Sequence, residues 1–171
     1  MLVSIIIPCF NEKNTIEEID NKVLSNNDYK KEIIIIDDYS SDGTKEILKN
    51  NLENKVQKIV FNDKNFGKGY AVRKGIEEST GDIILIQDAD LEYDPQDYKK
   101  LVEPIELNEA DVVYGSRFIG SDKKRVLYFW HSVGNFFLTL LSNMLSNLNL
   151  TDMEVCYKAF RSDIIKNIKL N

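Results

Sequence analysis

The sequence predicts an α/β fold in which a mostly parallel sheet carries helices on both faces. Short runs of β-branched residues alternate with helical patterns through the first two-thirds of the chain, as in repeated β-α units. Residues 33–36 are apolar without interruption, which is typical of a strand covered on both sides. The length of 171 residues, without a linker or an internal repeat, indicates a single domain over residues 1–171.

The expected elements follow one another along the chain. Strands are expected at residues 3–7, 33–36, 56–61, 83–87 and 111–115, and helices at 14–24, 44–52 and 70–78. Asn14 is the expected cap of the first helix, because Glu17 follows at the spacing of a capping box. Residues 94–97, Asp-Pro-Gln-Asp, start a further helix with a cap, a first-turn proline and an acid at the positive end of the dipole. The apolar face of this helix is formed by Tyr98, Leu101, Val102 and Ile105.

Residues 126–151 contain no Asp, Glu, Lys or Arg. Apolar residues recur there at helical spacing opposite an uncharged polar side, which predicts an amphipathic helix that is too polar to span a membrane. Packing of its apolar side on the core is the plainer interpretation, and contact with a lipid surface is the alternative. The apolar series is Val126, Trp130, Val133, Phe137, Leu141, Met144 and Leu148, and the polar series is Ser132, Asn135, Thr139, Ser142, Asn143 and Ser146.

The bulk composition excludes some classes of function. A net charge of −6 argues against non-specific binding of nucleic acid, which needs a basic surface. Cys9 and Cys156 lack the spacing of a metal site, so they are expected to be reduced core thiols of a cytosolic protein. The N-terminus has neither a basic start nor a small-residue cleavage site, so no signal peptide and a cytoplasmic location are expected.

Acidic residues gather where predicted strands end. Glu12 comes shortly after the first strand, Asp37 and Asp38 follow the second, and Asp88 and Asp90 follow the fourth. Because the carboxyl ends of parallel strands meet at one edge of a sheet, these carboxylates would repel one another without a cation between them. Oxygen ligands of this kind suit Mg²⁺ or Mn²⁺, whereas an Asp that caps the next helix is the plain alternative.

Six motifs, in this order, resemble glycosyltransferase family 2, and within it the branch of dolichyl-phosphate and polyprenyl-phosphate sugar synthases. The resemblance covers nearly the whole chain, and it implies the Rossmann-like GT-A fold. The motifs that carry it are "SIIIPCFNE", "IIIIDDYSSDGT", "NFGKGYAVRKG", "GDIILIQDADLEYDP", "DVVYGSRF" and "TDMEVCYKAFR".

The resemblance implies a donor in which a sugar is linked to UDP or GDP. At matching positions, the implied donor-binding residues are Pro8, Phe10, Glu12, Ile36, Asp37, Asp38, Asp88, Ala89, Asp90 and Arg117. The first three would line the nucleoside pocket, and Ile36 and Asp38 would hold the base and ribose with support from Asp37. Asp88 and Ala89 would border the ribose and the diphosphate.

The catalytic roles that the resemblance implies fall to Asp90 and Arg117. Asp90 would bind the divalent cation together with Glu92, at a position where the branch often has Gln. Arg117 would meet a phosphate, because a guanidinium fork matches phosphate oxygens. The cation would stabilise the nucleoside diphosphate as it leaves.

In this branch the acceptor is a polyprenyl phosphate, whose phosphate anion would attack the sugar in one inverting displacement. Residues 126–151, with Leu127, Trp130, Phe136 and Phe137, are expected to make weak peripheral contact with the cytoplasmic membrane face. Pairing of this helix with its copy in a homodimer is the alternative.

Relatives of this branch usually continue with further acceptor-side residues and a basic C-terminal segment, which residues 1–171 are expected to lack. Two other functions therefore stay open. One is transfer to a growing glycan, and the other is donor binding without turnover.

Overall fold

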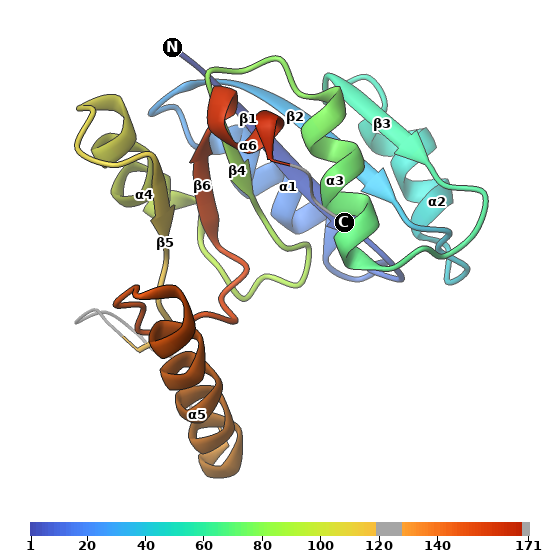
Figure 1. The fold of residues 1–171 in the computed structure, drawn as a ribbon. Helices are drawn as coiled ribbons and strands as arrows, with labels where there is room; N and C mark the ends of the chain where they lie inside the picture. The colour runs from blue at the N-terminus through green and yellow to red at the C-terminus, as the bar shows by residue number, and fades with distance from the viewer. Residues whose placement is uncertain (119–127, 169–171) are drawn as a thin grey trace.

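The computed structural model describes residues 1–118 and 128–168 (Figure 1). The strands among them are β1 (Leu2–Cys9), β2 (Lys30–Asp37), β3 (Lys58–Phe61), β4 (Ile83–Ile86), β5 (Val112–Tyr114) and β6 (Lys158–Arg161). The helices are α1 (Ile16–Ser25), α2 (Thr44–Ile47), α3 (Lys68–Glu78), α4 (Tyr98–Glu106), α5 (Phe129–Ser146) and α6 (Ser162–Asn167), with a π-helical turn η1 (Leu48–Leu52) and a 3-10 turn η2 (Pro95–Asp97).

The strands form one sheet in the order β3-β2-β1-β4-β6-β5. The pairs β1 with β2, β1 with β4, and β2 with β3 are parallel, whereas β6 is antiparallel to both β4 and β5. The mostly parallel sheet is therefore confirmed. The antiparallel strand β6 is an addition to the strands that the sequence predicts.

Helices cover both faces of the sheet, as predicted (Figure 1). Ile5 and Ile35 point to one face and belong to the apolar cluster that includes α1, η1 and α4. Ile6 and Ile84 point to the opposite face, where they pack with apolar residues of α3 and α6. Successive side chains of a strand alternate between faces, so the unbroken apolar runs supply two cores at once.

The start of α1 differs from the prediction. The helix begins at Ile16, Thr15 occupies the N-cap position, and no side chain caps the helix. The backbone carbonyl of Glu12 instead accepts the N–H groups of Thr15 (3.1 Å) and Ile16 (2.9 Å). Asn14 is therefore not the cap, because a backbone turn has taken over that function.

Two other predicted helices have different outcomes in the structure. The predicted helix 44–52 is α-helical only to Ile47 and then widens into the π turn, which leaves Leu48 and Leu52 fully buried. The predicted start at residues 94–97 is confirmed, since the Asp94 side chain accepts a hydrogen bond from the N–H of Gln96 at 3.0 Å. The four predicted face residues of α4 are all buried.

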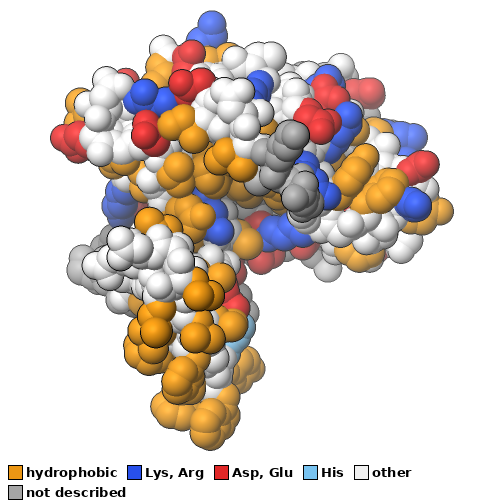
Figure 2. Space-filling model, in the orientation of Figure 1, with side chains coloured by type: hydrophobic (Ala, Val, Ile, Leu, Met, Phe, Trp, Pro, Cys, Tyr) orange, Lys and Arg blue, Asp and Glu red, His pale blue; other side chains and the backbone are white. Residues whose placement is uncertain are grey.

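Helix α5 projects from the rest of the molecule (Figures 1 and 2). The predicted amphipathic helix is confirmed for its described part, whereas Val126 and Leu127 lie outside the described residues. Its polar side faces the protein, since Asn135 and Thr139 are only 3% and 5% exposed. Its apolar side faces outward, with Trp130 at 79% and Leu145 at 89% exposure, so the core-packing interpretation is wrong.

The reason for this orientation is a polar stripe on α5, formed by Asn135, Thr139 and Asn143 at positions i, i+4 and i+8. It hydrogen-bonds the chain as it returns toward β6 along residues 150–153. None of the described helices has the combination of length and hydropathy needed to cross a membrane. The contacts of the stripe are Asn135 Nδ2 to Asp152 Oδ1 (3.0 Å), the N–H of Met153 to Thr139 Oγ1 (3.2 Å), Asn143 Nδ2 to the carbonyl of Leu150 (2.8 Å), and the N–H of Leu150 to Asn143 Oδ1 (2.9 Å).

Candidate functional site

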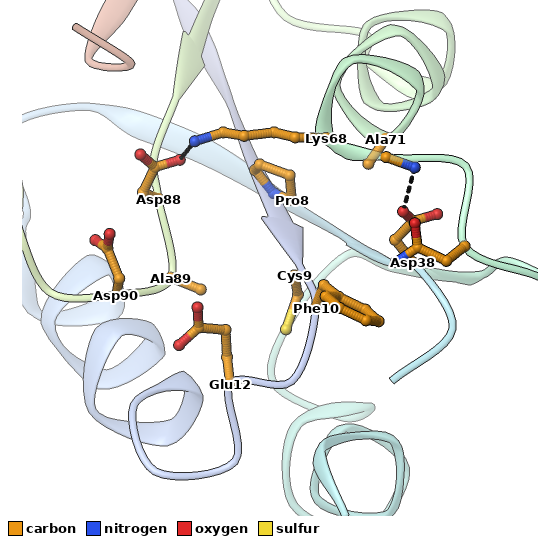
Figure 3. A pocket seen from close by; sticks show the side chains of 12 residues that line it. Pro8, Cys9, Phe10, Glu12, Asp38, Lys68, Ala71, Asp88, Ala89 and Asp90 are labelled. Carbon is orange, nitrogen blue, oxygen red and sulfur yellow. Dashed lines mark hydrogen bonds and ion pairs between the residues drawn. The ribbon is translucent and has the colours of Figure 1, made fainter. Parts of the chain in front are cut away.

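The carboxyl ends of β1, β2 and β4 meet at one edge of the sheet, because these strands are parallel and in register. A cavity of about 360 Å³ lies there, within the size range of small-molecule sites (Figure 3). Seven of the ten predicted donor-binding residues line it. The lining residues are Pro8, Cys9, Phe10, Glu12, Asp38, Asn65, Gly67, Lys68, Ala71, Asp88, Ala89 and Asp90.

The loop after β1 forms one wall of this cavity. Phe10 is half exposed there and offers an aromatic surface, while the backbone N–H of Glu12 donates to Thr44 Oγ1 at 2.9 Å. The Glu12 carboxylate accepts a hydrogen bond of 2.6 Å from Thr15 Oγ1. Glu12 is thus fixed both by its backbone and by its side chain at the cavity wall.

The end of β2 places its residues unequally. Ile36 and Asp37 are fully buried and do not line the cavity, whereas Asp38 does. The Asp38 carboxylate accepts hydrogen bonds from Asn62 Nδ2 (2.7 Å) and from the backbone N–H of Gly67 (2.7 Å). In this structure Asp38 therefore holds the glycine-rich loop in place, and its role toward a nucleoside stays a prediction.

Burial raises the pKa of Asp37, because the charged carboxylate loses its hydration. Its Oδ1 atom has no hydrogen-bond partner among the described residues, while Oδ2 accepts a long hydrogen bond from the N–H of Ser40 (3.4 Å). Asp37 is therefore a buried group that does not line the cavity, and its supporting role stays a prediction.

The end of β4 brings opposite charges together. Lys68, from the start of α3, reaches across the cavity to Asp88, with 2.5 Å between Nζ and Oδ1 (Figure 3). Lys68 Nζ also donates to Cys156 Sγ at 2.9 Å. Burial by itself lowers the pKa of Lys68, but these two partners outweigh it and the pKa is raised. Lys68 therefore carries a full positive charge against an otherwise acidic lining.

The two predicted metal ligands lie on the loop that follows. The backbone N–H of Glu92 donates to Asp90 Oδ1 at 3.0 Å, and the Asp90 carboxylate is exposed to the cavity. No group of three or more His, Cys, Asp or Glu side chains poised for a metal occurs within residues 1–118 and 128–168. Two carboxylates still fit Mg²⁺ or Mn²⁺, because such ions are commonly bound by one or two carboxylates plus water and substrate phosphate.

Backbone strain marks the same three strand ends. Asn11 after β1, Tyr39 after β2 and Leu91 after β4 have φ angles of 57°, 69° and 64°. A left-handed conformation is uncommon for residues other than glycine, and such strain concentrates at functional sites. Three of the five non-glycine residues with positive φ among the described residues thus lie in the loops that follow these strands.

Arg117 lies away from the cavity wall. Its Nε and Nη2 atoms bind Asp152 at 2.7 Å and 2.8 Å, in a bidentate ion pair. Burial by itself would raise the pKa of Asp152, but the hydrogen bonds from Arg117 and Asn135 outweigh it and the pKa is lowered. The structure thus gives Arg117 a carboxylate partner, and its predicted phosphate contact stays a prediction.

Sequence reasoning missed the contribution of the segment before and at the start of α3. Asn65, Gly67, Lys68 and Ala71 all line the cavity. The motif "NFGKGY" contains the signal, since Gly67 has φ 88° and turns the chain so that Lys68 enters the cavity.

Comparisons with known proteins found similar sequences and similar folds. Residues 4–169 match the sequence model of the family described as glycosyl transferase family 2. The chain is 29% identical to the dolichol-phosphate mannosyltransferase of Pyrococcus furiosus, over 100% of this chain and 49% of that protein. It is 28% identical to the dodecaprenyl-phosphate galacturonate synthase of Rhizobium johnstonii, over 98% of this chain and 50% of that protein. The chain therefore spans about half the length of these curated relatives.

Solved structures support the fold. The chain superposes with a TM-score of 0.75 on the glucosyl-3-phosphoglycerate synthase of Mycobacterium tuberculosis in complex with Mn²⁺, UDP and glucosyl-3-phosphoglycerate, at 19% identity, over 97% of this chain and 58% of that one. For residues 1–349 of TarS from S. aureus the TM-score is 0.67 at 21% identity, over 98% of this chain and 49% of that one. At such identities the likeness concerns the fold, and the GT-A fold is confirmed.

Proposed function

Since the chain belongs to glycosyl transferase family 2, we propose that it transfers a sugar from a nucleoside diphosphate to a polyprenyl phosphate, with inversion and with a divalent cation. The observation that carries this proposal is the acid-lined cavity at the carboxyl ends of β1, β2 and β4. A crevice at this position is where open α/β sheets bind their ligands.

The donor fits the cavity in size and in chemistry. Phe10 offers a flat surface to a nucleoside base, and the volume of about 360 Å³ suits a ligand of that size. Glu12 and Asp88 are held in place by their own partners, so the wall is formed before a ligand arrives.

The cation would be held by Asp90 and Glu92. When bound, it would neutralise charge on the diphosphate as the bond to the sugar breaks. Asp90 presents its carboxylate to the cavity, while its Oδ1 accepts the N–H of Glu92 and so orients the loop. The surrounding acids would otherwise repel a diphosphate, so their presence favours a cation-dependent site.

The acceptor proposal rests on α5. Its outward side carries large exposed apolar residues, and Trp130 suits a membrane interface. A phosphate anion attacks the sugar without a general base, so no catalytic His is needed. Because α5 lacks Lys and Arg, its contact with lipid would be weak and reversible, at the cytoplasmic membrane face.

Calorimetry of UDP and GDP binding tests the donor half. We expect binding in the presence of Mn²⁺ that weakens strongly after EDTA is added. Equal affinity under both conditions would contradict the cation requirement, and no binding of either nucleotide would contradict the donor site itself.

Liposome flotation tests the lipid contact. The wild type should float with vesicles that contain a polyprenyl phosphate, and the double variant Trp130→Ser, Phe137→Ser should not. Both side chains are exposed, so the variant should fold normally. Leu107→Ser, which removes an exposed leucine at the end of α4, is the matched control and should float like the wild type. Flotation of all three proteins alike would place the contact elsewhere.

Three alternatives have distinct outcomes. Pairing of α5 with its copy predicts a homodimer that the double variant converts to a monomer, as measured by light scattering. Transfer to a growing glycan predicts turnover without lipid, and donor binding without turnover predicts neither transfer nor donor hydrolysis.

A further inference from the structure

A buried polar network joins α5 to the rest of the protein. The Asp152 carboxylate accepts hydrogen bonds from the backbone N–H of Arg117 (3.2 Å), from its Nε (2.7 Å) and Nη2 (2.8 Å), and from Asn135 Nδ2 (3.0 Å). Asp152 is 1% exposed and Asn135 is 3% exposed. Three segments thus converge on one carboxylate: the chain after β5, helix α5, and the return toward β6.

Attaching a helix through this network costs more free energy than attaching it through apolar packing would. Burying an ion pair costs desolvation that well-packed apolar side chains would avoid. Asn135 Oδ1 adds to the cost, since it is buried and has no hydrogen-bond partner among the described residues. What the network supplies and apolar packing does not is a fixed geometry, because its hydrogen bonds are directional.

The same return segment also reaches the cavity. Four residues after Asp152, Cys156 Sγ accepts the hydrogen bond from Lys68, which pairs with Asp88 on the cavity wall. Residues 152–156 therefore connect the two places: Asp152 attaches α5, and Cys156 contacts Lys68, which lines the cavity.

We propose that Asp152 is a positioning residue that holds α5 and Arg117 together. The apolar side of α5 then contacts lipid in a fixed orientation relative to the donor cavity. This rests on the proposed function and adds a role for a residue outside the cavity. Asp152 touches neither donor nor acceptor in this role. It acts through the orientation of α5 and of the Arg117 guanidinium.

Trp130 provides a direct readout, because it is the single tryptophan of the chain and lies in the first turn of α5. In Asp152→Asn, the steady-state fluorescence anisotropy of Trp130 should fall, because the helix gains local motion. Asn135→Ala should lower it as well while leaving the Arg117 pair intact, and it carries the test if Asp152→Asn does not fold. Asp111→Asn is the control, since Asp111 is exposed and pairs with Arg161 at the other end of β5.

Kinetics provide the second readout. Asp152→Asn should raise the KM for a polyprenyl phosphate in vesicles about tenfold or more, the scale of a misplaced reactant, with little change in nucleoside diphosphate affinity. A merely stabilising residue would not separate these two quantities in a protein that is still folded.

The outcomes are distinct. Unchanged Trp130 anisotropy and unchanged acceptor KM in folded Asp152→Asn and Asn135→Ala would overturn the positioning role. An equal loss of acceptor and donor affinity would also overturn it, because it would assign Asp152 to general stability. If the wild type transfers no sugar, the proposed function fails, and the anisotropy measurement still decides whether Asp152 locks α5.

Discussion

Helices α4 and α5 have similar amphipathic patterns and opposite surroundings. In α4 the apolar side packs on the sheet, and Leu101 is 4% exposed. In α5 the polar side is the attached one, and Leu145 is 89% exposed. A pattern predicts which residues share a face, but the available partners decide which face is buried. The amides and hydroxyl of the α5 stripe find such partners in residues 150–153.

The sharpest test of this comparison replaces one leucine in each helix. Leu101→Ala should lower the free energy of unfolding by about 2–5 kcal/mol, because it opens a cavity in the core. Leu145→Ala should change it by less than about 0.5 kcal/mol, because it removes an exposed side chain. Urea denaturation measures both. A comparable loss in Leu145→Ala would show that α5 packs against the protein in solution.

The second test separates the cavity from α5 by function. Asp90→Ala should lower the turnover of an active form about 10²-fold, the scale of losing a major charge stabiliser, while liposome flotation stays unchanged. The double variant in α5 should show the reverse pattern. The exposed Asp63→Ala, on the loop after β3, controls for the loss of one negative charge. Full activity of Asp90→Ala would remove it from the catalytic set.

The third test concerns how closely α3 packs on the sheet through apolar contacts, in contrast to α5, which is attached through hydrogen bonds. A Cβ atom at Gly75 would lie 2.3 Å from Ile6 Cγ2, so Gly75→Ala should cost about 1–3 kcal/mol of stability. Gly69→Ala in the same helix meets no atom within 4 Å and should be neutral or slightly stabilising. Equal thermal midpoints for the two variants would contradict this packing.

The smallest effect concerns Asp20, a buried carboxylate that, unlike the Asn135 side chain of α5, has no hydrogen bond through either of its polar atoms in the described part of the chain. Neither oxygen of Asp20 on α1 has a partner among the described residues, and burial raises its pKa to about 6. The folded state therefore holds a proton that the unfolded state releases near pH 4, so stability should fall as pH rises from about 4 to 6.

Asp20→Asn should remove that dependence and raise stability at pH 7 by on the order of 1 kcal/mol, because no buried charge remains. Thermal midpoints of wild type and variant between pH 4 and pH 7 provide the measurement. Parallel curves for the two proteins would show that Asp20 is not the group responsible.

Much of the fold could be predicted because its strands are apolar on both faces. The apolar runs in β1, β2 and β4 indicate buried strands, and Asp94 with Pro95 marks the start of the turn that leads into α4. The strand β6 could not be predicted, because Lys158–Arg161 is short and charged at both ends. It becomes a strand only through its pairing with β4 and β5.

Part of the candidate site could likewise be predicted from the sequence, and part could not. Glu12, Asp88 and Asp90 lie within four residues of the end of an apolar strand, and the strand ends place them at the cavity. Lys68 depends on a glycine turn, and Arg117 is held by a partner 35 residues away in sequence. Contacts of such long range leave no local pattern, so only a three-dimensional arrangement reveals them.

The order of strands in the sheet has a consequence for synthesis. Strand β6 lies between β4 and β5, although it follows both in the chain. While the ribosome is still producing the segment from residue 115 to 157, β5 has no strand to pair with and one edge of β4 is open. The nascent chain must carry this open edge until residues 158–161 emerge. Chaperone contacts with the nascent chain should therefore decrease once residues 158–161 have emerged, and crosslinking of stalled nascent chains of increasing length would reveal it.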